Sequence, residues 1–336
     1  MDACDLLPAE LALDRLEAAL AAELPAHVRA FARAHAAGTA PPPWPHDARA
    51  LAAVARALGH EVLLDRAVAL ARLLYPIAVA DDPSVAAAVR GGARTWPSYA
   101  ALAAARDRAA RARCGRGFGE VMRALHGVLA RAPNDGDNDA DARSRDGEAR
   151  AGWMRPDGIV VTLADVAARW RGMGGELRLQ LVGSTAHPRA FVVEPGREVI
   201  LVVPERIATP AARFAALHEL GHARVAALAP AGTPRVLDEA VASFTARAME
   251  DPGDPWYSPH AAAARARRTA HAAALAAIEA GALPTSTGEV PWALVHDPGA
   301  QATYAAAEAV ADGIADDDLA RWLATERARI DHATRL

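Results

Sequence analysis

Two stretches of the chain have the pattern of β-strands: ELRLQLVG at residues 176–183 and RAFVVEPGREVILVVP at residues 189–204. The second stretch contains two apolar runs joined by the turn sequence EPGR, and it predicts a β-hairpin. Most of the remaining chain is rich in alanine and shows the three-to-four spacing of amphipathic helices. The sequence therefore predicts an α+β fold that is predominantly helical, with a small β-sheet followed by long helices.

The same patterns divide the chain into three parts. Residues 1–130 contain successive amphipathic helices, and we expect them to form an all-helical N-terminal domain. Residues 131–150 contain almost no apolar side chains, so they cannot bury enough surface to offset the entropy of ordering; we expect a disordered linker. Residues 151–336 form the part that contains the sheet. The expected helices are 9–23, 26–36, 47–58, 62–73, 98–112, 116–130, 162–171, one after Pro210, 236–250, 259–281, 299–313 and 316–330.

Charge and composition limit the classes of partner. The chain has 37 basic and 41 acidic side chains, a net charge of −4, so it lacks the basic excess that nucleic acids or acidic membrane surfaces require. Cys4 and Cys114 are far apart and have no metal-ligand spacing. We find no secretory signal and no apolar run of about 18 residues, and therefore expect a soluble cytoplasmic protein. The sequence does not indicate an oligomeric state.

The sequence RFAALHELGHARVAAL, residues 213–228, contains the pattern HExxH. Positions four apart lie on one face of a helix, so His218 and His222 can hold one metal ion between them. Glu219 lies beside the first histidine and can act on a water molecule at the metal, as a general base does in zinc hydrolases. Gly221 removes side-chain bulk where another backbone could approach. Apolar neighbours on the histidine face predict that the pair lies at a buried wall; these neighbours are Phe214, Leu217, Val225 and Leu228.

A catalytic zinc site needs a third protein ligand, and the next helix offers two acids. Glu239 follows His222 by 17 residues, enough for the first helix to end, for the chain to turn, and for the second helix to return antiparallel. Both Asp238 and Glu239 could also be first-turn acids that interact with the helix dipole. That role suits Asp238, whereas small and apolar residues follow Glu239 and favour an inward position. We therefore expect His218, His222 and Glu239 to be the metal ligands.

With these residues the chain resembles the glutamate-zincins, zinc metallopeptidases of the peptidase MA superfamily. HELGH followed by PRVLDEAVASF is similar to the motif of the aminopeptidase-like branch, with Ala240 where that branch usually has glycine. The resemblance implies that Tyr304 helps to stabilise the oxyanion of the tetrahedral intermediate, and that strand 189–194 is an edge strand that binds the substrate backbone. The chain lacks a recognisable glutamate motif for binding a substrate N-terminus, so the resemblance does not extend to aminopeptidase activity.

Two related families share parts of the pattern. Metallopeptidases that cleave repressors also have RF…HELGH followed by a helix with glutamate, alanine and phenylalanine, which EAVASF resembles. Oligopeptidases of the thimet type have a downstream cluster that His296, Gly299 and Tyr304 could match, and His296 would then contact the substrate or the oxyanion. All of these families are glutamate-zincins, so the choice among them changes the substrate and leaves the zinc chemistry the same.

Two functions are compatible with these patterns. The first is a zinc-dependent metallopeptidase that acts on a peptide or protein substrate, with Glu219 as general base. The second is a non-catalytic or regulatory module with a zincin fold that binds a protein partner. The intact Glu219 favours the enzyme, because a non-catalytic relative has no chemical need for a general base.

Overall fold

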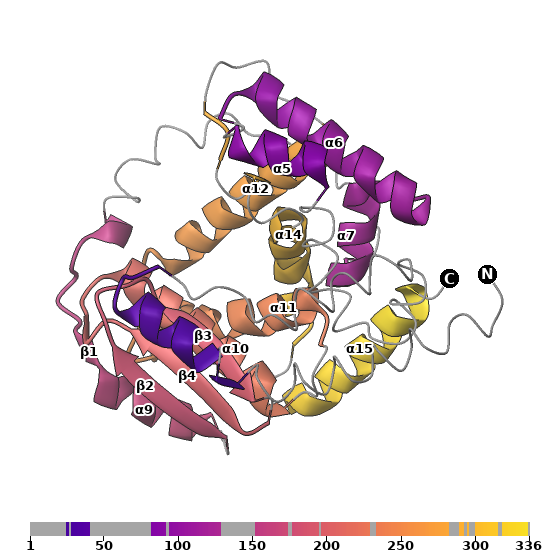
Figure 1. Cartoon of the computed structure of the whole chain (residues 1–336). Helices are drawn as coiled ribbons and strands as arrows, with labels where there is room; N and C mark the ends of the chain where they lie inside the picture. The colour runs from indigo at the N-terminus through magenta and orange to yellow at the C-terminus, as the bar shows by residue number, and fades with distance from the viewer. Residues whose placement is uncertain are drawn as a thin grey trace.

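The computed structural model confirms a predominantly helical α+β fold with a small sheet (Figure 1). Within its described residues, no helix is long and apolar enough to cross a membrane. The predicted helices 9–23, 47–58 and 62–73 and the predicted linker 131–150 lie outside the described part of the chain. The structure describes residues 25–40, 82–128, 152–281 and 289–334, apart from 27, 92–93, 174–176, 195, 229–232, 292–293, 296–299 and 315–317.

The sheet has three strands in the order β2-β4-β3: β2 (Arg178–Gly183), β4 (Glu198–Val203) and β3 (Arg189–Glu194). The predicted hairpin is confirmed, because β3 and β4 pair antiparallel and Gly196 in their turn has a φ of 72°. The central strand β4 is parallel to β2 and is buried along its whole length. Its apolar, β-branched sequence suits a strand that is covered on both faces.

Helices cover the two faces of the sheet. The helix α10 (Pro210–Leu228) and the short helix α9 (Leu163–Gly172) share an apolar core with Leu201 of β4 and its neighbours on that face. On the other face, residues 28–36 form a helix whose Ala32 packs against Phe191 and Val202 (indigo in Figure 1). This arrangement places α10, which carries the HExxH pattern, directly against the sheet.

The remaining helices of the C-terminal part pack in succession beyond α10. α10 packs on α11, α11 on α14, and α14 on α12, so α11 lies between the HExxH helix and the later helices (Figure 1). The α15 helix contacts α11. A strand pair, β1 with β5, lies outside the main sheet. The bounds are β1 (Val161–Thr162), β5 (Arg206–Ile207), α11 (Arg235–Ala246), the 3-10 helix η2 (Arg247–Glu250), α12 (Ala261–Glu279), α14 (Ala300–Ala311) and α15 (Leu319–Thr334).

The N-terminal helices contact the C-terminal part directly. Besides the helix at 28–36, the described N-terminal elements are α5 (Pro83–Arg90), α6 (Trp96–Cys114) and α7 (Phe118–His126). Arg106 of α6 is buried and donates hydrogen bonds to the carbonyl groups of Leu294 (3.0 Å) and Val295. Arg29 pairs with Glu198 of β4 at 2.6 Å. The division into domains 1–130 and 151–336 stays a prediction, and the described segments of the two parts share these contacts.

Candidate metal centre

The two helices that carry the site approach each other closely at Gly221. A Cβ atom added at Gly221 would lie 2.4 Å from Cα and 3.0 Å from the backbone nitrogen of Ala242 in α11. The expectation that another backbone approaches this glycine is therefore confirmed. Three of the four apolar neighbours of the histidines are buried as predicted, whereas Leu228, the last residue of α10, is 44% exposed. At the end of the helix the side chain no longer has a packing partner on every side.

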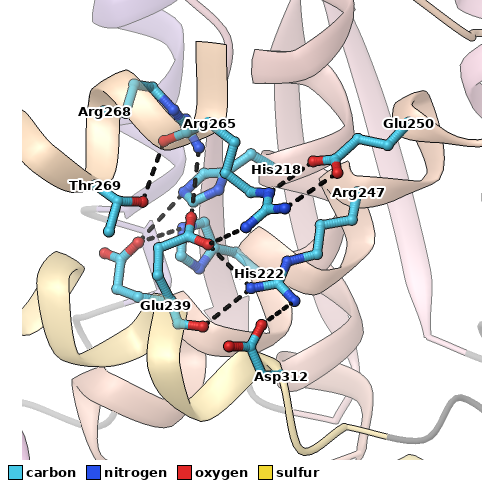
Figure 2. Close-up of polar contacts among 10 residues, drawn as sticks. His218, His222, Glu239, Arg247, Glu250, Arg265, Arg268, Thr269 and Asp312 are labelled. Carbon is cyan, nitrogen blue, oxygen red and sulfur yellow. Dashed lines mark hydrogen bonds and ion pairs between the residues drawn. The ribbon is translucent and has the colours of Figure 1, made fainter. Parts of the chain in front are cut away.

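Three predicted ligands converge at this helix pair. His218, His222 and Glu239 each offer one ligand atom, and these atoms all lie within 4.8 Å of one another (Figure 2). Oε2 of Glu239 is 3.3 Å from Nε2 of His218 and 3.8 Å from Nε2 of His222. Glu239 is 4% exposed, so its predicted inward position is confirmed.

The donor atoms of these three side chains are arranged to bind a metal ion rather than to form hydrogen bonds with one another. Oε2 of Glu239 is buried and makes no hydrogen bond of acceptable geometry to any described residue, despite its short distance to His218. A buried carboxylate oxygen without a partner is costly, because its lost hydration is not replaced. A cation placed among the three side chains would replace it. Two imidazoles and one carboxylate are also the ligand set of known catalytic zinc sites.

Asp238 orients one of the two histidines. Its Oδ1 lies 2.8 Å from Nδ1 of His222, which leaves Nε2 of that ring for the metal. A carboxylate in this position is common beside metal-bound histidines, where it fixes the tautomer and the ring orientation. The sequence indicated only a first-turn acid, and Asp238 is indeed in the first turn of α11. The sequence signal for this role was the position of Asp238 directly before a predicted ligand. Whether its side chain faces His222 depends on the packing of α11 on α10, which the sequence does not give.

His218 lacks an equivalent partner among the described residues, because its Nδ1 is buried without a hydrogen bond. Ser243, one turn after Glu239, is buried at 5% exposure. The two histidine ligands are therefore held unequally: a carboxylate fixes the ring of His222, whereas packing holds the ring of His218, which stacks on Phe214 with ring centroids 6.1 Å apart.

The charges of the site act on the protonation of its ligands. Burial lowers the pKa of His222, but the neighbouring carboxylates of Asp238, Glu239 and Glu219 outweigh burial and raise it. Burial raises the pKa of Glu239, but the two histidines and Arg235 outweigh burial and lower it. Without a metal ion, a proton on His222 supplies the positive charge that these acids favour. A divalent cation would supply the same charge and displace that proton.

Glu219 connects the HExxH helix to the sheet. Its Oε2 accepts a hydrogen bond of 2.6 Å from the backbone nitrogen of Ala190 in β3. β3 is an outer strand of the described three-stranded sheet, so this amide belongs to the strand edge that β4 does not pair. The predicted general base is thus next to His218 in sequence and is held at the strand expected to bind a substrate backbone.

The other two predicted site residues are Tyr304 and His296, and the structure describes the first of them. Tyr304 lies in α14, and the guanidinium carbon of Arg235 lies 5.8 Å from the centre of its ring. Nε of the same arginine is 3.6 Å from Oε1 of Glu239, so Tyr304 is linked to the ligand set through Arg235. His296 lies outside the described residues.

The sequence did not predict that arginines lie beside the metal ligands. The guanidinium carbon of Arg268 lies 3.7 Å from the centre of the Phe214 ring, which stacks on His218. Oxygens of Glu308 lie 3.1 Å from Arg247, 3.6 Å from Arg268 and 3.9 Å from Arg265 (Figure 2 labels the three arginines). Arginines are frequent throughout this chain, so no spacing distinguished these three. Arg265 and Arg268 reach Glu308 because α12 packs on α14, and Arg247 reaches it from η2.

Comparison with known proteins adds no assignment. No family model matches the chain, and neither a curated protein nor a solved structure matches it.

Proposed function

We propose that this protein is a zinc-dependent metallopeptidase, a hydrolase of the glutamate-zincin type that cleaves peptide bonds. The ligands are His218, His222 and Glu239, and the general base is Glu219. The observation that carries the proposal is the convergence of three ligand atoms within 4.8 Å of one another, at a buried carboxylate oxygen that has no described hydrogen-bond partner. The Asp238 carboxylate on His222 supports the same reading, because structural histidine pairs do not require this orientation.

A zinc ion held by His218, His222 and Glu239 would act as a Lewis acid and bring the pKa of a bound water molecule close to neutrality. The chain supplies the proton transfers. Glu219 accepts a proton at its carboxylate and returns it to the leaving amine, a role that suits its place next to His218. Its hydrogen bond to Ala190 lies at the edge of β3 away from β4, and we propose that the substrate backbone lies along that edge.

Oxyanion stabilisation is assigned to Tyr304, with His296 as the second candidate. The support for Tyr304 is its contact with Arg235, which itself reaches Glu239. A phenol or an imidazole that donates a hydrogen bond where negative charge develops lowers the barrier of acyl transfer. The proposal includes a cytoplasmic location, on the ground of the two widely separated cysteines.

The second candidate is a regulatory module with the same scaffold that binds a protein partner without turnover. The hydrogen bond between Glu219 and the amide of Ala190 favours it, because a carboxylate that holds a strand edge serves a structural role. In the enzyme, the substrate must release Glu219 from this amide. In the module, the contact would persist.

One experiment separates the two functions. We would measure bound metal by mass spectrometry and cleavage of a peptide library for the wild type, Glu219→Gln and Glu120→Gln, whose carboxylate lies on α7 and is 58% exposed. The peptidase predicts about one zinc per chain in all three proteins and cleavage lost only in Glu219→Gln. Zinc without turnover in the wild type supports the module. A wild type that binds no metal contradicts the peptidase and the assignment of His218, His222 and Glu239 as ligands.

A further inference from the structure

A hollow lies away from the metal ligands, between α9, α10, α11 and η2. It has a volume of about 590 Å³, within the range of small-molecule sites. Arg224 of α10 lines it, two residues after His222 and therefore about 200° further around the helix. The hollow and the metal ligands thus lie on different faces of α10. The other lining residues are Ala168, Arg169, Gly172, Met173, Phe244, Thr245, Arg247 and Ala248.

The lining is rich in guanidinium groups. Arg169, Arg224 and Arg247 contribute three guanidinium groups, and the lining described by the structure includes no acid. Two of these arginines form ion pairs with acids that are not part of the lining. Asp254 pairs with Arg169 at 2.7 Å, and Asp312 pairs with Arg247 at 2.7 Å. Arginines fixed in this way lose little further freedom when they bind a ligand.

Two of the lining residues each have a buried donor atom without a described partner. The hydroxyl of Thr245 is buried and has no hydrogen bond within the described part of the chain, and the residue is 4% exposed. A threonine inside a helix can bond a carbonyl of the preceding turn, and Thr245 does not. Nε of Arg247 is also buried without a described partner, although the two terminal nitrogens of that group bond Asp312 and Glu308. Buried donors without acceptors are costly, and a bound acceptor would relieve that cost.

We propose that this hollow binds a small organic anion. Its phosphate or carboxylate group accepts hydrogen bonds from Thr245 and Arg247, beside the guanidinium groups of Arg169 and Arg224, since charge-assisted hydrogen bonds are the strong ones. Its apolar body packs on Met173 and Phe244, which also line the hollow. The inference does not depend on peptidase activity, because it uses neither Glu219 nor the metal.

The test uses the full chain and four probes: phenyl phosphate, phenylacetate, inorganic phosphate and the neutral benzyl alcohol. Calorimetry and thermal unfolding give Kd and Tm for the wild type, Thr245→Val and Arg169→Gln. Matched controls are Thr325→Val and Arg321→Gln on α15, where Thr325 bonds a helix carbonyl and Arg321 is 81% exposed. We expect at least one organic anion to bind the wild type and raise its Tm, more tightly than benzyl alcohol or inorganic phosphate.

Thr245→Val should weaken the binding about 3- to 10-fold and Arg169→Gln about 10-fold, while both controls leave it unchanged. Thr245→Val is nearly isosteric, so it remains informative if Arg169→Gln fails to fold. Stronger binding of phenyl phosphate or of phenylacetate identifies the head group, and either result supports the site. The proposal is overturned if neither organic anion binds, if benzyl alcohol binds equally well, or if Thr245→Val binds the anions as tightly as the wild type.

Discussion

Gly221→Ala is the substitution whose effect follows most directly from the geometry. Its Cβ would lie 2.4 Å from Cα of Ala242, and ordinary contact begins at 3.4 Å, so α10 and α11 must move apart by about 1 Å. The clashing atoms belong to the backbone and cannot rotate away. Overpacking of this kind costs about 3 kcal/mol, and the better helix propensity of alanine returns about 1 kcal/mol. We therefore expect the free energy of unfolding to fall by about 2 kcal/mol, measured by urea denaturation.

The same displacement should weaken metal binding. His218 and His222 lie on α10 and Glu239 on α11, and metal sites tolerate only about 0.2 Å of error in ligand distances. Zinc affinity, measured by competition with a chelating dye, should fall at least about tenfold. The control is Gly172→Ala at the end of α9, where an added Cβ meets nothing within 4 Å. A Gly221→Ala protein as stable as Gly172→Ala, with wild-type zinc affinity, would refute the reasoning.

Three further predictions concern single contacts. Asp238→Asn should reduce zinc affinity about 10- to 100-fold in the same dye competition, because it weakens the hydrogen bond that orients His222; wild-type affinity would exclude that role. Zinc affinity should fall as pH decreases from 8 to 6, because neighbouring carboxylates raise the pKa of His222 and the metal must displace its proton. Calorimetry in buffers of different ionisation enthalpy should show that zinc binding releases a proton. Binding without proton release would argue against the raised pKa. Asp157→Asn should cost about 3 kcal/mol at pH 7, because Arg213 is fully buried and its bidentate partner is lost. Hydrogen bonds from Arg213 lower the pKa of Asp157 in the folded protein. The stability from this pair is therefore present above about pH 4, the pKa of an unfolded Asp, and is lost as pH falls through the lower pKa of the folded state. In urea denaturation, the difference in unfolding free energy between wild type and Asp157→Asn should shrink at low pH, and a constant difference would contradict the assignment.

The sequence was informative where local spacing determines geometry. The four-residue spacing of His218 and His222 places them on one helix face, and the hairpin follows from two apolar runs around a turn. The third ligand, Glu239, could be predicted because the spacing from His222 allows the second helix to return antiparallel, and small and apolar residues after Glu239 favour an inward position. These inferences need no knowledge of distant parts of the chain.

The sequence was uninformative where long-range packing decides. The parallel pairing of β2 with β4 could not be read from the strand patterns, which predict only the hairpin. The contact of Asp238 with His222 depends on the rotation of α11 about its own axis. The helix α5 is only eight residues long and was missed, although Asp82 caps it and Pro83 occupies its first turn, both usual start signals.

The central claim is that His218, His222 and Glu239 hold one zinc ion. The most direct measurement is the zinc content and zinc affinity of the purified wild type beside Glu239→Gln and the exposed control Glu120→Gln, with circular dichroism to verify folding. We expect about one zinc per chain in the wild type and the control, and a loss of at least about tenfold in affinity for Glu239→Gln. A wild type that binds no zinc, or a folded Glu239→Gln protein that binds it as tightly, would contradict the claim.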